Sequence, residues 1–359
     1  MKKIMAIALT AMMTVSLAAC GGSKQEAAPA AAAPAAAPAA AAPAESKAEA
    51  KAEAAPAAAE AAAPAELDWP KKTINIYMTH GAGGDTDYMG RALAQRLEGV
   101  LGVSVPVTNV TGSNGATCMQ QYKDGDPDGY TFIATNTAAL NGNEATGMVD
   151  FGYDAFEPVA VYGMQSGENI VVKADSPYNN LKELLDASIA APDTIKFGIS
   201  TGGGVYIMSC VMTNLGGAKF SIIESGDGAS RLTALLGGEV DATSLPYSTA
   251  KDYIEKGELK SLCTCLSKAP DLIPDQESAS KTIPELKVDT EYVLLAPKGT
   301  PAEIVKAMND AVLEVGKTDD WKKLVNDYCF QNPFVLNVDE TVENLKNQRE
   351  LFQSFKPFL

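Results

Sequence analysis

Ser200 is the first candidate for chemistry, because it lies in a run that can form a nucleophile elbow. Residues 198–202 read G-I-S-T-G and fit G-x-S-x-G, and the surrounding pattern predicts a strand before the serine and a helix after it. An α/β-hydrolase also needs a histidine after the serine, whereas the single histidine of the chain, His80, lies upstream. We therefore expect no enzyme, and a secreted serine esterase using Ser200 is kept only as an alternative.

Signatures for metals and cofactors are incomplete. Residues 124–129 read D-G-D-P-D-G and open like a calcium loop, but the twelfth position is Thr135 where a bidentate glutamate is needed, which favours a polar turn. Cys263 and Cys265 alternate in a predicted strand at residues 259–266, and a zinc site would need two further ligands, so we expect two buried side chains. Neither G-x-G-x-x-G nor G-x-x-x-x-G-K-[ST] occurs. We predict neither a metal nor a cofactor.

Two glycine-rich turns, each leading from a strand into a helix, could bind an anion. The strand predicted at residues 74–78 is followed by G-A-G-G at 81–84, and the strand predicted at 196–200 is followed by T-G-G-G at 201–204. The apolar faces of the two following helices are Met89, Leu93 and Leu97, and Met208, Val211, Met212 and Leu215. Such turns expose backbone N–H groups beside the positive end of a helix dipole. The repeated device suggests two lobes that hold one ligand.

The elements that must position these turns alternate along the chain. Further strands are expected at residues 105–110, 130–134 and 170–173, and further helices at 117–122, 181–187 and 229–236. This alternation predicts an α/β fold.

The first 66 residues indicate export. Lys2 and Lys3 precede an apolar stretch, and L-A-A-C at residues 17–20 resembles a bacterial lipobox, so residues 1–20 are expected to be a lipoprotein signal peptide with lipidation at Cys20. Residues 21–66 consist almost entirely of alanine, proline, glutamate and lysine, which predicts a disordered tether. We expect an extracytoplasmic protein anchored by lipid, either in a periplasm or on the outer face of a single membrane.

Composition excludes some partners and leaves the cysteines open. The chain of 359 residues has 29 basic and 45 acidic side chains, a formal charge of −16, which argues against a nucleic-acid partner. Attraction of an anion must then come from local dipoles. Five cysteines follow Cys20, an odd number whose pairing the sequence leaves open: Cys118, Cys210, Cys263, Cys265 and Cys329.

Five blocks in order resemble one family. The loop at residues 78–87, the runs at 109–115 and 127–131 (P-D-G-Y-T), L-L-G-G-E-V-D at 235–241 and L-A-P-K-G-T-P at 295–301 are similar to the solute-binding proteins of tripartite tricarboxylate transporters, also called Bug proteins. The resemblance spans residues 70–355.

The resemblance implies an α/β periplasmic-binding-protein fold of two lobes (type II-like) with the ligand in the cleft between them. Lobe 1 would comprise residues 68–168 plus 290–359, and lobe 2 residues 169–289. The protein would be a monomer that captures a small carboxylate, such as a dicarboxylate or tricarboxylate, an aromatic acid or an amino acid. It would pass this ligand to membrane permease subunits. A sensor or adaptor for a signalling partner is the second alternative, because it would use the same cleft.

The candidate ligand-binding residues come from the two glycine turns, the end of the strand at 130–134 and the far wall. They are Gly81, Ala82, Gly83, Gly84, Asp85, Thr86, Thr135, Asn136, Thr137, Ser200, Thr201, Gly202, Gly203, Gly204 and Ser244. His80 is expected at the strand end, facing solvent or the hinge, and Arg231 is expected on the surface.

Two acidic residues depart from the family pattern. Asp85 stands where the family usually has glycine, and Glu224 falls where it commonly has tyrosine. A carboxylate there would repel an acidic ligand unless it is paired. We hypothesise that the ligand carries an amino or other cationic group, with Asp85 or Glu224 as its partner.

Overall fold

The computed structural model describes residues 67–359. The expected signal peptide at 1–20, its lipidation site Cys20 and the tether at 21–66 lie outside these residues. Within 67–359, no helix is both long and apolar enough to cross a membrane.

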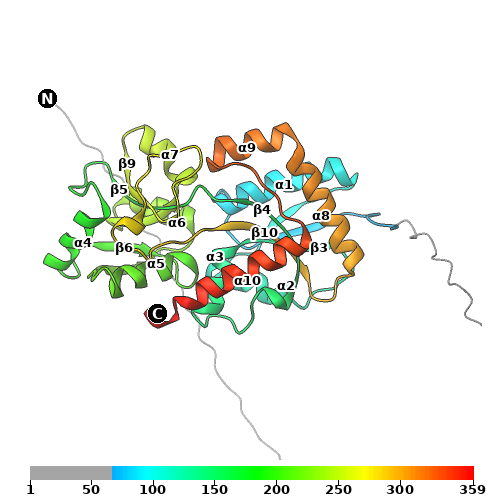
Figure 1. Ribbon diagram of the computed structural model, residues 1–359, viewed down its shortest axis with the longest axis horizontal. Helices are drawn as coiled ribbons and strands as arrows, with labels where there is room; N and C mark the ends of the chain where they lie inside the picture. Colours follow the sequence, from blue (N-terminus) through cyan, green and yellow to red (C-terminus); the bar gives the residue numbers. More distant parts are fainter. Residues whose placement is uncertain (1–66) are drawn as a thin grey trace, which may run out of the picture. The chain divides into compact units, whose positions relative to one another are not determined.

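The first sheet has five strands in the order β2-β1-β3-β10-β4. Their bounds are β1 Asn75–Met78, β2 Val107–Asn109, β3 Thr131–Asn136, β4 Phe156–Met164 and β10 Glu291–Pro297. Strand β1 pairs in parallel with β2 and β3, whereas β10 is antiparallel to both of its neighbours. A strand from late in the chain therefore fills the gap between two early ones (Figure 1).

Helices cover both faces of the first sheet. One face packs against α1 (Asp85–Leu101), α8 (Ala302–Lys317) and α9 (Asp319–Cys329), and the other against α2 (Ala116–Tyr122), α3 (Thr137–Ala145) and α10 (Val338–Ser354). Helix α1 has the predicted apolar face, with Met89, Leu93 and Leu97 all buried against the sheet. Two short 3₁₀ turns, Ser113–Gly115 and Tyr153–Ala155, complete this part.

The second sheet has the order β7-β6-β8-β5-β9. Its strands are β5 Glu168–Lys173, β6 Lys196–Ile199, β7 Ser221–Glu224, β8 Ala242–Pro246 and β9 Leu259–Thr264. Helices α4 (Leu181–Ala190) and α5 (Gly203–Asn214) pack on one face, and α6 (Gly228–Gly237) and α7 (Tyr247–Glu255) on the other. We call each sheet with its helices a lobe; Figure 1 shows the second in green and yellow.

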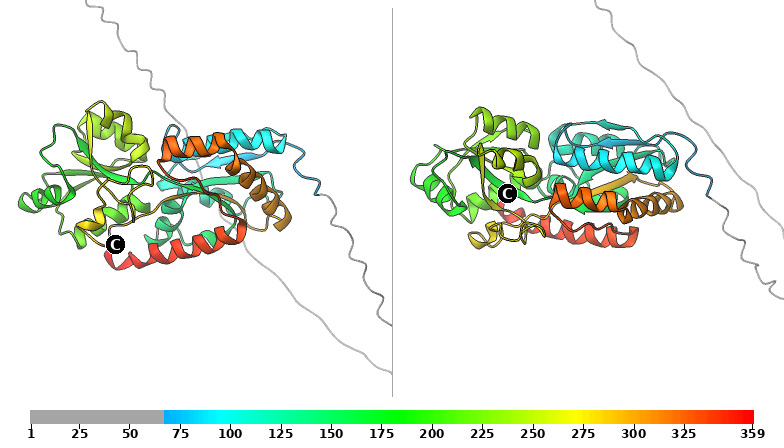
Figure 2. Two further views of the ribbon diagram at one scale, coloured as in Figure 1. Left: turned by 45° about the horizontal axis from the view of Figure 1, so that its top comes forward. Right: turned by 90° about the horizontal axis from the view of Figure 1, so that it is seen from above.

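Three parts of the chain join the lobes. Residues 165–167 connect β4 to β5, and residues 265–290, with the 3₁₀ turn Ala279–Lys281, connect β9 to β10. The end of α10 makes the third link, since Phe352 and Phe355 are buried in the core of the second lobe and Asn214 donates to the Phe358 carbonyl at 2.8 Å. Figure 2 shows α10, in red, ending in the 3₁₀ turn Lys356–Phe358 beside that lobe.

Most predicted elements are present with bounds shifted by a few residues. The expected face of α5 is buried at Met208, Val211 and Met212, but Leu215 was wrongly included: it follows the last helical residue and is 42% exposed. Cys263 and Cys265 are buried as expected, although β9 ends before the second of them. All five cysteines of the described chain are free thiols. The lobe boundaries given by residue number stay a prediction.

Candidate functional site

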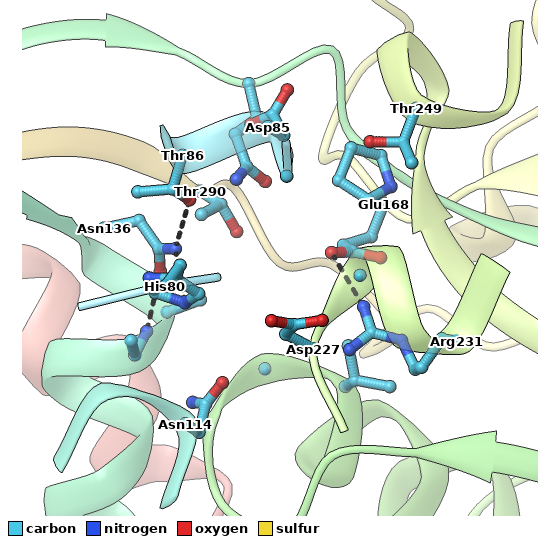
Figure 3. Close-up of a pocket in the computed structure, with 18 of the residues that line it drawn as sticks. His80, Asp85, Thr86, Asn114, Asn136, Glu168, Asp227, Arg231, Thr249 and Thr290 are labelled. Carbon is cyan, nitrogen blue, oxygen red and sulfur yellow. Dashed lines mark hydrogen bonds and ion pairs between the residues drawn. The ribbon is translucent and has the colours of Figure 1, made fainter. Parts of the chain in front are cut away.

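A polar cavity of about 60 Å³ lies between the lobes (Figure 3). Since one water needs about 10–15 Å³ of such space, the cavity has room for a few atoms only. We call it the inner cavity. It is lined by His80, Gly81, Gly84, Asp85, Thr86, Asn114, Asn136, Ala138, Ala139, Gln165, Glu168, Gly204, Val205, Asp227, Gly228, Arg231, Pro246, Thr249 and Thr290.

Five helices begin at this cavity. The lining includes the residues at or just before the first turns of α1, α3, α5, α6 and α7: Gly84, Asn136, Gly204, Gly228 and Pro246. At each helix start, backbone N–H groups lack helical partners and the helix dipole is positive. Together these helix ends contribute partial positive charges to the cavity wall.

Asn136 fixes the chemistry of the wall formed by the first lobe. Its Oδ1 accepts from the N–H of Ala139 at 2.8 Å and caps α3, so its Nδ2 must face Thr86 (3.0 Å) and His80 Nε2 (3.3 Å). The imidazole Nε2 is therefore an acceptor, and Nδ1 carries the proton toward Thr79 Oγ1 at 2.7 Å. The side chain is held in one tautomer.

His80 is neutral at physiological pH. Burial, together with the charge of Arg231, lowers its pKa to about 4 against the opposing influence of Asp227 and Asp87. His80 lines the inner cavity, whereas the sequence led us to expect it to face solvent or the hinge. Both imidazole nitrogens are already bonded, so His80 has none free to act as a base toward Ser200, the serine of the esterase alternative.

Asp85 joins the two lobes. Its carboxylate accepts from Ser248 of α7 at 2.6 Å and from the Tyr292 hydroxyl of β10 at 2.6 Å. Burial raises its pKa to about 6, although both hydrogen bonds act to lower it. Asp85 is therefore mostly ionised at pH 7, and its negative charge sits at the start of α1.

Arg231 is buried, which corrects the prediction of a surface position. It is 4% exposed, and it donates through Nε to the Ser244 carbonyl (3.0 Å) and through Nη1 to the Gly226 carbonyl (3.0 Å). Its Nη2 lies 3.7 Å from Glu168 Oε1. The first turn of α6 faces the cavity, so a residue near the helix start points inward.

Glu168 is the partner of Arg231 and was not anticipated. It lies at the start of β5, and its Oε2 accepts from Ser244 Oγ at 2.6 Å. Burial raises its pKa, while Arg231 and Ser244 act to lower it. Glu168 and Arg231 form a buried ion pair in the wall of the second lobe.

Asp227 caps α6 and points into the cavity (Figure 3). Its Oδ1 accepts from the Ser230 N–H at 3.0 Å. Burial acts to raise its pKa, but the hydrogen bonds from Ser230 and the positive charge of Arg231 lower it below its usual value. Asp227 is therefore ionised at neutral pH.

A second cavity of about 530 Å³ adjoins the first and shares His80, Gly81, Asn114 and Asp227 with it. We call it the outer cavity. Ser200, Thr201 and Glu224 line it, and the Glu224 carboxylate accepts from the Thr201 N–H at 2.7 Å and from its hydroxyl.

The structure separates the predicted site residues into three groups. Gly81, Gly84, Asp85, Thr86, Asn136 and Gly204 line the inner cavity, and Ser200, Thr201 and again Gly81 line the outer one. The remaining candidates, Ala82, Gly83, Thr135, Thr137, Gly202, Gly203 and Ser244, line neither. Three of these support the wall instead: Ser244 binds Glu168, Thr135 accepts from Thr79, and Thr137 accepts from the Glu291 N–H.

Several lining residues had no signal in the sequence. Gln165, Glu168 and Thr290 lie in or next to the segments that connect the two sheets, outside any glycine turn. For Asp227, the pattern of an aspartate followed by a predicted helix at 229–236 is a capping signal that could have identified it.

Comparison with known proteins gives the same fold and a family. The family model described as "Tripartite tricarboxylate transporter family receptor" matches residues 89–350. Protein BugT of Bordetella pertussis is 26% identical over 287 residues, which cover 77% of this chain and 86% of BugT.

Two solved structures are similar in fold. The periplasmic binding protein BugD has a TM-score of 0.73 at 22% identity, with 81% of this chain and 98% of BugD covered. MatC from Rhodopseudomonas palustris with bound malate has a TM-score of 0.72 at 20% identity, with 80% of this chain and 100% of MatC covered. The expected periplasmic-binding-protein fold is confirmed. Because the family match extends over most of the described residues, the chain belongs to the tripartite tricarboxylate transporter receptor family, the one that its five sequence blocks resemble.

Proposed function

We propose that this protein is a lipid-anchored receptor that closes over a small carboxylate and presents it to the permease subunits of a tripartite transporter. The observation that carries this proposal is the convergence of five helix N-termini on one polar cavity between two lobes. Membership of a receptor family and the malate bound in MatC support it. The lobes would be residues 68–168 plus 290–359 and residues 169–289, and the protein would act as a monomer.

The position of the cavity indicates closure around the ligand. Residues of both lobes line this space of about 60 Å³, so a ligand larger than the space can bind only if the lobes first move apart. Asp85 bonds across the lobes to Ser248, and that contact would re-form once the ligand is inside. The ligand then favours the closed state by contacting both lobes at once.

The test is a thermal-shift panel on the purified protein, unfolded and refolded to remove any ligand carried over. Dicarboxylates, tricarboxylates, aromatic acids and amino acids are added one at a time. A ligand at about a hundred times its Kd adds ~2.7 kcal/mol to stability, which is easily measured. A shift with one chemical class supports the proposal, and a folded sample that responds to no small acid contradicts it.

The anchor has a separate test. In cells, a Cys20→Ser variant is expected to move from the membrane fraction to the soluble fraction, because it cannot be lipidated. An unchanged distribution would remove the lipid from the proposal and leave the receptor function standing.

A further inference from the structure

The inner cavity has more acidic than basic side chains. Asp85, Glu168 and Asp227 all line it, whereas Arg231 is its one positively charged side chain, because His80 is neutral there. A ligand with two carboxylates and no positive group would add two further negative charges to a cavity whose side chains are already mostly acidic. Taking such charges out of water without partners is costly.

Two of the three carboxylates already have partners in the protein. Ser248 and Tyr292 each donate to one oxygen of Asp85. Glu168 accepts from Ser244 and faces Arg231. These two groups can be buried as charges without help from a ligand.

Asp227 is placed differently. One of its oxygens caps α6 by accepting from Ser230, and the carboxylate points into the cavity between His80 and Arg231 (Figure 3). The second oxygen, Oδ2, comes so close to Gly81 that a Cβ there would lie 2.1 Å away, so only glycine leaves it this position. The protein thus holds a charged acceptor at the cavity surface.

Two buried polar atoms without partners also line the cavity. Gln165 is 3% exposed and its Oε1 has no hydrogen-bond partner, and Thr290 is 2% exposed and its Oγ1 has none. An amide oxygen can only accept, so a ligand carboxylate cannot satisfy Gln165, whereas an N–H group can. Buried polar atoms normally have partners, so the Gln165 oxygen indicates a donor that comes with the ligand, while the Thr290 hydroxyl can accept from the ligand or donate to it.

The N-termini of helices α3 and α5 are suited to bind a carboxylate. Helices α3 and α5 have no acidic residue in their first turns, in contrast to α1, and both contribute to the cavity lining. The cavity therefore combines anion-binding helix ends with acceptors suited to an ammonium group.

We propose, on the basis of the receptor function above, that the ligand is a small amino acid and that Asp227 binds its ammonium group. The carboxylate of the ligand lies at the helix N-termini. This assigns the cationic partner to Asp227 rather than to Asp85, which is already bonded twice, or to Glu224, which is exposed in the outer cavity and bonded to Thr201.

The experiment compares matched ligands by calorimetry on refolded, ligand-free protein. The pairs are alanine with propionate, aspartate with succinate, and glutamate with glutarate, which differ only in the amino group. Wild type is expected to bind an amino acid and to bind its deaminated partner about tenfold or more weakly, as expected for loss of a charged hydrogen bond.

Asp227→Asn is the informative variant, because asparagine caps a helix as well as aspartate does while removing the charge. It should lower affinity for the amino acid about tenfold or more without lowering affinity for the deaminated acid. Asp252→Asn is the control, since it removes one charge from an exposed position on α7 of the same lobe.

Three other outcomes would contradict the inference, and they can be told apart. If wild type binds the deaminated acid equally well, or Asp227→Asn leaves amino-acid affinity unchanged, the inference is wrong while the receptor function stands. Loss of selectivity in Glu224→Gln instead of Asp227→Asn would move the cationic site to the outer cavity and overturn the assignment. A folded wild type that binds no acid of either kind contradicts both proposals.

Discussion

Arg231 and Glu168 show how much one buried pair can matter at the scale of single residues. The side chains are 5% and 11% exposed, and each has hydrogen bonds to the β8 residue Ser244. A buried ion pair adds little compared with apolar packing, but loss of one partner leaves an uncompensated charge.

Arg231→Met should therefore destabilise the protein by about 3–5 kcal/mol at pH 8. The pKa of Glu168 is already raised by burial and would rise further without the guanidinium. A carboxyl whose folded pKa is raised binds more protons in the folded state, so stability falls as pH rises through that pKa. The difference between variant and wild type should shrink toward pH 5, as measured by urea unfolding at several pH values.

Lys306→Met is the matched control, because Lys306 forms an exposed pair with Asp310 on α8. It should change stability by no more than about 0.5 kcal/mol, with no such dependence on pH. If Arg231→Met behaved like this control, the pair would have no structural role.

Single residues also mark the limit of what the sequence could predict. The glycine turn at 81–84 and Asn136 were identified because their chemistry is local: a turn and a cap need only their neighbours in the chain. Arg231 was wrongly expected on the surface because its partner, Glu168, lies on strand β5, far from it in the sequence, and belongs to no recognisable motif. Gln165 and Thr290 were missed for the same reason.

At the scale of elements, α3 of the first lobe and α5 of the second meet backbone to backbone. A Cβ on Gly142 would lie 2.4 Å from the Cα of Gly203, the first residue of α5. That distance is far shorter than any carbon contact allows. The closed arrangement therefore requires glycine at position 142.

Gly142→Ala should weaken ligand binding by keeping the lobes apart. The unliganded protein should remain folded, because alanine is a better helix former than glycine by about 1 kcal/mol. Small-angle scattering should show that wild type becomes more compact on adding ligand and that the variant does not.

Gly99→Ala provides the control, since Gly99 lies in α1 and a Cβ at that position would have no atom within 4 Å. It should retain full affinity. Equal compaction of both variants would show that α3 and α5 do not limit closure.

Strand β10 has a buried acid where it faces α10. Glu291 is 4% exposed and accepts from Asn344 at 3.2 Å and Gln348 at 3.5 Å, and burial raises its pKa to about 7. Because this pKa lies above that of an unfolded glutamate, the contribution of Glu291 to stability is lost as pH rises from about 4.5 to 7.

Glu291→Gln should therefore be more stable than wild type at pH 8, by up to about 3 kcal/mol, and equally stable near pH 4.5. The amide can donate to the oxygens of Asn344 and Gln348, which lack partners in the wild type. Thermal unfolding across this pH range measures the difference, and parallel curves for the two proteins would contradict the argument.

Elements whose apolar residues recur with a clear period could be predicted from the sequence, and elements without such a period could not. Strand β1 follows a local apolar pattern and was placed within one residue of its bounds, and the apolar face of helix α1 was predicted from a pattern of the same kind. Strand β10 is buried along its whole length, and all but two residues of β4 are, so neither shows the alternation that marks a strand with one exposed face.

At the scale of the whole molecule, the last helix links both lobes. Phe352 is fully buried in the core of the second lobe, although α10 begins against the first. Phe352→Ala should lower stability by about 3–5 kcal/mol and speed hydrogen exchange in the second sheet.

Leu351→Ala is the control one position earlier, where the side chain is 37% exposed. It should have little effect on either measurement. Faster exchange confined to α10 itself in Phe352→Ala would show that the second lobe does not depend on this link.

The late position of β10 and α10 in the chain also determines when the protein can fold as it is made. The first sheet has a gap between β3 and β4 until residue 297 is synthesised, and the core of the second lobe lacks Phe352 and Phe355 until the final residues emerge. Neither lobe can complete its core on a nascent chain. A receptor of an extracytoplasmic family must cross a membrane, and this arrangement leaves both cores incomplete until synthesis is nearly finished, which favours a chain that can still be threaded through a secretion channel.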